Sequence, residues 1–306
     1  MRNKRIIPGE LHHVYQRSYD RGLLFYSSAD VLTYFTICMT MAKRYEIRVI
    51  GVCPMRDHVH QLVIPPSVSA MTKFEMGTNR LYAREFNLDI SRQGQIFEHS
   101  YDFAVKRDGK RARSSIIYLY DNPVEKQLCK KAVEAKWNFL AYGFSSHPFS
   151  EPCKIEETSR KLRRSMEEVE SSHEQGRYLN QRQIRRLFEN LDPDQKNILT
   201  DFIVETYSII DYERLFSYWK SSQEMLVAMD STTGAEYGIN EGTDRFSDDR
   251  IYYKIGAFVA KTWKLTQLKD VLKMSEVERF RMVGPIQRAT GAETYHIYKF
   301  LHLSHK

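Results

Sequence analysis

Hydrophobic residues recur with two different periods along the first third of the chain. Residues 29–45 and 70–86 repeat apolar side chains every three to four positions, which predicts two amphipathic helices, although Gly77 weakens the second. Short apolar runs typical of β-strands occupy residues 11–18, 47–52, 58–64 and 101–106. The order β-α-β-β-α-β indicates an α+β fold of the ferredoxin-like kind, in which an antiparallel sheet carries its helices on one face.

The second half of the chain is a different kind of sequence. Residues 199–219 are apolar and are expected to be buried, whereas the glycine-containing stretch 229–250 is typical of a loop. Helical patterns cover residues 155–170, 181–190, 251–263, 268–272, 275–282 and 286–303. We therefore expect two domains, an α+β domain over residues 1–150 and an all-α domain over residues 151–306.

Residues 284–303 contain a short helix, a turn at Gly291 and a second helix, and this arrangement resembles a helix-turn-helix. Duplex DNA is then the expected partner of the segment. The polar side chains expected to face outward on its second helix are Thr294, Tyr295, His296 and Lys299. An all-helical protein-interaction module has the same sequence pattern and is the alternative.

Composition limits the classes of protein to which the chain can belong. With 306 residues, 42% of them hydrophobic, it is long enough to form real cores. It has no apolar run of about 20 residues, so no membrane span is expected, and its basic N-terminus lacks the apolar stretch of a signal peptide. The four cysteines form no CxxC pair, which argues against a disulfide scaffold or a zinc ribbon. A cytoplasmic location is expected.

Positive charge is concentrated in the first half of the chain. Residues 1–150 carry 22 Lys and Arg against 14 Asp and Glu, whereas residues 151–306 carry 24 against 25. The densest cluster, KRDGKRAR, lies at residues 106–113 and is expected to form a basic loop. Such a surface favours a polyanionic partner, although a solvated loop that keeps the protein soluble has the same composition.

Two histidines, His58 and His60, flank one hydrophobic residue at the start of a predicted strand. Side chains at i and i+2 share a face, so the two imidazoles project together while Val59 enters the core. Such a pair is a common start for a divalent-metal site, but it also occurs by chance. Asp57 can orient an imidazole from behind, although strand alternation places it on the opposite face. His12 and His13 are expected to be packing or solvent-facing residues of the first strand.

Residues 114–122 are predicted to form about two turns of helix, framed by Ser114 and by Pro123. Within these turns Tyr118 and Asn122 are four residues apart and share a face, while Tyr120 lies on nearly the opposite side. Taken alone, this pattern favours an ordinary helix with packed tyrosines. The alternative is a tyrosine nucleophile with an amide ligand one turn below it.

Three stretches together resemble the single-tyrosine HUH transposases, and within them the branch of repeat-associated tyrosine transposases of bacteria. They are PMRDHVHQLV at residues 54–63, YLYDNPV at residues 118–124 and HHVYQRSYDR at residues 12–21. The resemblance covers residues 8–150. It implies an HUH nuclease domain that cuts and rejoins single-stranded DNA next to a hairpin, through a covalent 5′-phosphotyrosine.

The resemblance assigns roles to individual residues. Tyr118 is the implied nucleophile, and His58, His60 and Asn122 are the implied ligands of Mg²⁺ or Mn²⁺. A phenol has a pKa near ~10, so its attack near neutral pH is helped by a cation on the scissile phosphate. Nitrogen ligands are more usual for Zn, Fe or Cu, so the identity of the metal rests on the family. Tyr120 is the alternative nucleophile if the helix has a different register.

The implied partner is single-stranded DNA with a hairpin. Candidate phosphate contacts are Arg17, Arg21, Arg56, Lys106, Arg107, Lys110, Arg111 and Arg113. Tyr15 and Tyr19 can stack on unpaired bases or pack in the core. Both a monomer and a homodimer that exchanges its tyrosine helix are compatible with the resemblance. The competing functions are a DNA-binding regulator derived from a transposase and a metal-dependent phosphodiesterase that uses water.

Overall fold

The computed structural model describes residues 5–98, 101–152, 158–231 and 248–304. Its centre is an antiparallel sheet with the strand order β2-β3-β1-β4. The strands are β1 (Leu11–Arg17), β2 (Arg48–Pro54), β3 (His58–Ile64) and β4 (Asp102–Lys106). The α+β class and the antiparallel sheet are therefore confirmed.

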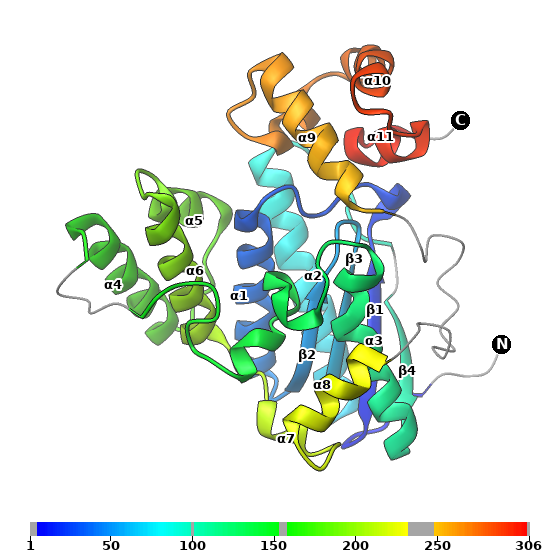
Figure 1. Ribbon diagram of the computed structural model, residues 1–306, viewed down its shortest axis with the longest axis vertical. Helices are drawn as coiled ribbons and strands as arrows, with labels where there is room; N and C mark the ends of the chain where they lie inside the picture. Colours follow the sequence, from blue (N-terminus) through cyan, green and yellow to red (C-terminus); the bar gives the residue numbers. More distant parts are fainter. Residues whose placement is uncertain (1–4, 99–100, 153–157, 232–247, 305–306) are drawn as a thin grey trace.

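The pleat of the strands gives the sheet two different faces. Helices α1 (Ser28–Arg44) and α2 (Val68–Asp89) pack with Val14, Val59 and Val63 in one apolar core. Helix α3 (Gly109–Glu125) packs with Leu62 in a second core on the opposite face, and Figure 1 shows α3 crossing the sheet. His58 and His60 alternate with Val59 along β3, so they belong to the face that carries α3.

Helix α3 is longer than the sequence pattern indicates, and the prediction that it starts at Ser114 and stops before Pro123 is wrong. It starts at Gly109 because the Asp108 side chain accepts a hydrogen bond from the Arg111 backbone nitrogen at 2.8 Å. It continues to Glu125 although Pro123 has no N–H to donate, and the Lys126 backbone nitrogen beyond it still donates to the Asn122 carbonyl oxygen at 3.0 Å. The basic stretch 106–113 is accordingly a strand end and a first helical turn, not a loop.

Tyr120 fixes the position of α3 against the sheet. Its hydroxyl group donates to the Ile50 carbonyl oxygen at 2.9 Å in the buried core. The neighbouring residue is Gly51, where a Cβ atom would lie 2.8 Å from the Tyr120 hydroxyl oxygen. A glycine in β2 therefore permits the close approach that anchors the helix.

The described residues after β4 form helices and loops, as the sequence predicts. The helices are α4 (Arg160–Glu174), α5 (Gln181–Phe188), α6 (Pro193–Tyr207), α7 (Tyr212–Phe216), α8 (Ser222–Ser231), α9 (Arg250–Trp263), α10 (Glu276–Thr290) and α11 (Thr294–Leu301), with 3-10 segments η1 (Tyr19–Arg21), η2 (Ala132–Glu134), η3 (Lys136–Asn138), η4 (Leu140–Gly143) and η7 (Leu268–Lys273). Most of the predicted loop 229–250 and the start of the helix predicted from residue 155 lie outside the described residues. None of the described helices is long and apolar enough to cross a membrane.

The helical half packs against the sheet-bearing half at several points. The buried residues of α4–α6 and α9–α11 belong to the same apolar cluster as α1 and α2, and Ile210 forms an isolated parallel bridge with Val49 of β2. Figure 1 places α4–α6 beside α1, and α9–α11 at one end of the sheet. The division into two domains near residue 150 stays a prediction.

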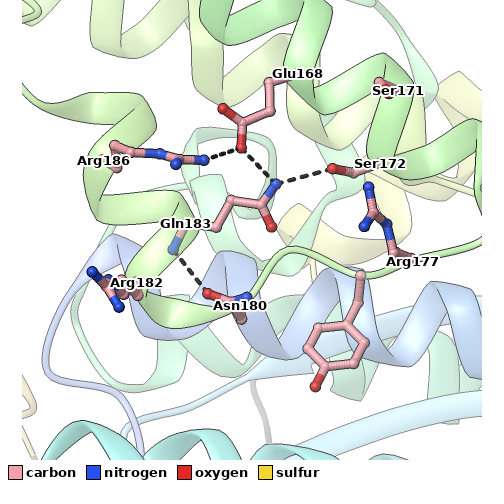
Figure 2. Close-up of a pocket in the computed structure, with 9 residues that line it drawn as sticks. Glu168, Ser171, Ser172, Arg177, Asn180, Arg182, Gln183 and Arg186 are labelled. Carbon is pink, nitrogen blue, oxygen red and sulfur yellow. Dashed lines mark hydrogen bonds and ion pairs between the residues drawn. The ribbon is translucent and has the colours of Figure 1, made fainter.

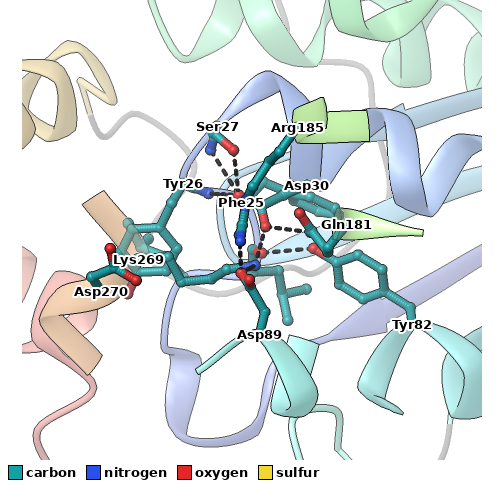
Figure 3. A network of polar contacts seen from close by, with 12 residues as sticks. Phe25, Tyr26, Ser27, Asp30, Tyr82, Asp89, Gln181, Arg185, Lys269 and Asp270 are labelled. Atoms are coloured by element: carbon teal, nitrogen blue, oxygen red, sulfur yellow. Dashed lines mark hydrogen bonds and ion pairs between the residues drawn. The ribbon is translucent and has the colours of Figure 1, made fainter. Parts of the chain in front are cut away.

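A buried ion-pair network joins the two halves (Figure 3). The ammonium group of Lys269 in η7 contacts the Asp30 carboxylate of α1 and lies 2.8 Å from the Asp89 carboxylate of α2. Arg185 of α5 pairs with Asp89, and Gln181 donates to Asp30 at 2.7 Å. Asp30 also accepts from the backbone nitrogens of Tyr26 and Ser27, and so caps α1. Two cations, two carboxylates and one amide thus connect α1, α2, α5 and η7.

A second buried carboxyl group, that of Glu75 in α2, has a different environment. Its side chain is fully buried, and neither oxygen has a hydrogen-bond partner among the described residues. Burial raises its pKa from 4.5 to about 8. Glu75 is therefore protonated in the folded protein at neutral pH.

We expect Lys269→Met to lower the free energy of unfolding by about 3 kcal/mol, because two buried carboxylates lose a shared cation. Lys273→Met is the matched control in the same segment. Lys273 pairs with Asp270 at the surface, so its loss is expected to cost less than about 1 kcal/mol. Urea unfolding of the three proteins measures both values, and equal losses would contradict the assigned role of Lys269.

We expect Glu75→Gln to stabilise the protein increasingly as the pH rises from 4.5 to 8. Below pH 4.5 the carboxyl group is protonated in both states; between 4.5 and about 8 only the unfolded chain releases the proton, so the wild type loses stability. The gain from the variant reaches about 4 kcal/mol at pH 8. Denaturant unfolding across this range tests it, with the exposed Glu205→Gln in α6 as the control. A pH-independent difference would show that Glu75 is ionised in the folded state.

Candidate active site

Three imidazoles lie together on the sheet face that carries α3. The ring centroids of His58 and His60 are 4.9 Å apart. His13, at the corresponding face of β1, is stacked on His60, with 3.0 Å between its Nε2 atom and the Nδ1 atom of His60. His13 thus packs within the sheet, as expected, and its packing partner is the imidazole of His60. His12 does point to the other face, where its ring accepts from the Ile7 backbone nitrogen and donates to the Glu10 carbonyl oxygen.

Asp57 contacts His58 directly, contrary to the expectation that strand alternation turns it away. The Nδ1 atom of His58 donates to the Asp57 carboxylate at 2.6 Å. The geometry is possible because β3 begins at His58, so Asp57 lies in the preceding bend and does not follow the strand period. The same contact selects the tautomer of the neutral ring, in which the proton lies on Nδ1 and the Nε2 atom has the lone pair.

Lys299 of α11 completes this chain of contacts from the other end of the sequence. Its ammonium group donates to the second oxygen of Asp57 at 2.9 Å, and its side chain is buried. Burial opposes both charges, but the facing His58 and Lys299 hold the pKa of Asp57 well below its usual range, and Asp57 raises the pKa of Lys299. The prediction that Lys299 faces outward for duplex DNA is wrong. The helix pair around Gly291 is present, but this side chain points into the site.

Tyr118 of α3 lies against the imidazoles of its own chain. The centroid of its ring is 5.4 Å from that of His60 and 5.7 Å from that of His13, with both pairs edge to face. The Tyr120 hydroxyl group is held in the core by Ile50, and burial raises the pKa of Tyr120 well above 10. Of the two tyrosines that the sequence leaves open, Tyr118 is the one that the fold brings to the histidines.

Asn122 lies one turn after Tyr118 and is buried. Its amide nitrogen donates to the Tyr118 carbonyl oxygen at 2.8 Å, which leaves the amide oxygen as the atom available to a ligand. No recorded contact in the described part of the chain joins Asn122 to His58 or His60. Its role as a ligand stays a prediction.

The imidazoles have features that suit a cation. The Nε2 atom of His58 is buried without a hydrogen-bond partner among the described residues. Burial, and then the neighbouring His58, lower the pKa of His60 well below 6.5, so His60 is neutral. The described residues contain no group of three or more His, Cys, Asp or Glu side chains arranged as a metal centre. A cation here would therefore rest on two imidazoles together with an amide, water or a phosphate oxygen.

Two further charged residues near the site were missed by sequence reasoning. Asp249, just before α9, is buried, and its pKa is raised by burial and by the charge of Asp57, against the opposing charges of Lys126 and His58. Lys126 follows α3, and its carbonyl oxygen accepts from the Asp249 backbone nitrogen at 3.2 Å. Nothing local in the sequence marks either residue, because the contact joins segments more than a hundred positions apart.

Some of the predicted DNA-binding residues lie close to the imidazoles. Arg17 is the register partner of His58, and its Nε atom donates to the Tyr15 hydroxyl oxygen at 2.7 Å. The Tyr15 ring in turn lies 5.2 Å from the His58 ring. Arg56 precedes Asp57 in the bend and donates to the Phe25 carbonyl oxygen at 3.1 Å. Arg21 is exposed in η1, as is Tyr19.

The rest form a group around the end of β4 and the start of α3. Four of them are exposed: Arg107, Lys110, Arg111 and Arg113. Lys106 is half-buried, and burial followed by the charge of Arg111 lowers its pKa. These residues lie at or just before one end of α3, whereas Tyr118 lies about one and a half to three turns further along the chain. Their contact with DNA stays a prediction.

A cavity of about 700 Å³ lies elsewhere, between α4 and α5 (Figure 2). Glu168 accepts from Arg186 and from Gln183 on its wall, and Gln183 also donates to Ser172 at 2.9 Å. Arg177 and Arg182 line it as well. None of the site residues predicted from the sequence is among its described lining residues, so it is separate from the imidazole cluster.

No family model matches the sequence, and no curated protein matches it. Among solved structures, the chain is similar to one described as a REP-associated tyrosine transposase bound to a REP hairpin. The two share 11% identity with a TM-score of 0.39, over 52% of this chain and 94% of the other. A TM-score of this size does not establish a common fold.

We expect Lys299→Met to release His58 from its single tautomer, because Asp57 would lose the cation that keeps it ionised and in place. Nitrogen NMR of the histidine side chains should show a proton fixed on Nδ1 of His58 in the wild type and a tautomer mixture in the variant. Lys254→Met, which removes an exposed lysine of α9, serves as the control. An unchanged His58 signal in Lys299→Met would mean that the lysine does not position the imidazole.

Proposed function

We propose that the protein is a metal-dependent transesterase of single-stranded DNA, with Tyr118 as the nucleophile. The observation that carries the proposal is the position of the Tyr118 ring, whose centroid lies 5.4 Å from that of His60. Both side chains lie on the sheet face where Asp57 orients His58. A phenol can serve as the nucleophile of phosphodiester exchange, and imidazole-bound cations and a nearby guanidinium can stabilise its developing charge. In this proposal the sheet and α1–α3 are an HUH nuclease domain of the ferredoxin-like kind.

In the proposed reaction the Tyr118 oxygen attacks the phosphorus of a phosphodiester. A bond forms between the phenolic oxygen and phosphorus, and the bond from phosphorus to the 3′ oxygen breaks. The phenol gives up one proton and the departing 3′ oxygen takes up one, so the exchange is neutral overall. A 3′ hydroxyl group reverses the step and rejoins the strand. Because the bond energy is kept in the phosphotyrosine, rejoining needs no other energy source.

The residues that would hold Mg²⁺ or Mn²⁺ are His58, His60 and Asn122. Such an ion, when bound, neutralises charge on the scissile phosphate and orients it. The chain's own contribution is to present His58 with its Nε2 lone pair inward, through Asp57 and Lys299, and to keep His60 neutral. In this proposal Arg17, the register partner of His58, binds the scissile phosphate of the DNA.

The proposed substrate is a single strand next to a hairpin. The exposed arginines and lysine at the start of α3 supply cations for the phosphate backbone, and the sequence-independent part of the affinity then falls with salt. Tyr118 and the histidines belong to one chain, so the proposal needs no second subunit to complete the site.

We expect wild-type protein, incubated with single-stranded hairpin DNA and Mn²⁺, to form a covalent adduct that migrates slowly on a denaturing gel. Tyr118→Phe should abolish the adduct, because it removes the attacking oxygen. Tyr120→Phe, its matched control, loses the hydrogen bond to Ile50, at a cost of about 1 kcal/mol of stability, but should keep the adduct.

The other outcomes identify the competing functions. Cleavage without any adduct would indicate a phosphodiesterase that uses water. Tight binding without cleavage in Mg²⁺ and in Mn²⁺ would indicate a DNA-binding regulator. An adduct lost in Tyr120→Phe but kept in Tyr118→Phe would contradict the assignment of the nucleophile.

A further inference from the structure

A cavity of about 410 Å³ opens directly behind the bend that carries Asp57. Its aromatic lining comes from Phe25, Tyr26, Trp137 and Tyr253, and its cations from Arg56 and Lys136. Phe25 and Tyr26 are buried, Trp137 is half-buried and Tyr253 is 59% exposed. The aromatic side chains therefore extend from the floor of the cavity to its mouth.

The walls of this cavity are continuous with the segments that build the imidazole site. Arg56 precedes Asp57, and Pro123 follows Asn122, so two lining residues are chain neighbours of candidate site residues. Helix α9 adds a third link. Asp249 and Tyr253 are four residues apart and lie on one side of the helix. The Asp249 carboxylate, whose pKa is raised by burial and by the charge of Asp57, therefore shares a helix face with the Tyr253 ring at the mouth of the cavity.

The chemistry of the lining is that of a stacking site with a positive charge. The Arg56 guanidinium lies over the Tyr253 ring, 4.5 Å from its centroid, and is held there by the Phe25 carbonyl oxygen. Arg56 thus presents a planar cation beside an aromatic face. The carboxylate that lines the cavity, Glu134, accepts from the backbone nitrogens of Lys130 and Lys131, so it is already engaged within its own turn.

We propose that this cavity receives an unpaired nucleobase of the strand whose phosphate lies at the imidazoles. The inference rests on the proposed function and names the subsite that holds the substrate next to the reacting bond. Its volume falls in the range of small-molecule sites, about 300–1,000 Å³. Aromatic rings and arginine planes are the groups on which proteins stack unpaired bases, whereas a paired duplex cannot offer one base alone.

The test compares two single strands of about 20 nucleotides, an oligothymidylate and a strand of the same length built from abasic units, with binding measured in EDTA. Both strands carry the same phosphates, but only the oligothymidylate has bases that can stack. We expect wild-type protein to prefer the oligothymidylate by roughly tenfold, and Tyr253→Ala to lose most of that preference. Tyr253→Phe should retain it, because the ring remains. Phe280→Ala, which removes an exposed aromatic of α10, should change neither affinity.

A second measurement does not depend on affinity. A strand that contains 5-iodouracil should cross-link on irradiation to a peptide containing Trp137 or Tyr253, as mapped by mass spectrometry. Cross-links confined to other peptides, or equal affinity of the wild type for the two strands, would overturn the inference. If the Tyr118 adduct forms while Tyr253→Ala behaves as the wild type, the base subsite is wrong and the proposed reaction stands. If base-dependent binding through Tyr253 is found without any adduct, the reaction is wrong and the subsite stands.

Discussion

An ammonium group that has no access to water must be matched by anions at fixed positions, and Lys269 meets this condition between Asp30 and Asp89. Much of the architecture depends on that match. Asp30 lies in the first turn of α1 and Asp89 is the last residue of α2. Each also contacts a polar group of α5, Asp30 through Gln181 and Asp89 through Arg185. Helices α1 and α2 are therefore joined to the helices after residue 150 by buried ion pairs as well as by apolar contact.

The sheet forms a site because its two faces pack against different helices, α1 and α2 on one face and α3 on the other. Val59 and Val63 of β3 enter the core with α1 and α2, so the intervening histidines must project toward α3. Tyr120 anchors α3 at Ile50, and the helical period then places Tyr118 over His60. Within one turn of α3, Tyr120 thus anchors the helix in the core, and Tyr118 lies against the imidazoles.

Much of the arrangement was predictable from local pattern. Short apolar runs indicated the strands of the sheet, and the spacing of His58 and His60 indicated two imidazoles on a shared face. The grouping of Tyr118 with these histidines followed from the resemblance and not from spacing. The bounds of α3 were not predictable from Ser114 and Pro123, because the Asp108 cap and the position of the proline in the last turn outweigh those signals. Asp57, Lys299 and Asp249 could not be grouped from sequence, since their contacts depend on a bend and on helices that pack from distant parts of the chain. The ligand role of Asn122 and the predicted DNA contacts concern partners outside the chain, and they stay predictions.

The pairing of Lys299 with Asp57 joins residues 242 positions apart, and translation delivers them in that order. When the sheet and α3 emerge from the ribosome, the histidines and Tyr118 are already present, but Asp57 has no lysine opposite it. A polypeptide that ends before Lys299 keeps the aromatic and imidazole groups but lacks the cation that faces Asp57. Only a chain synthesised as far as Lys299 has this contact, so the charge balance around Asp57 and His58 is completed late in synthesis.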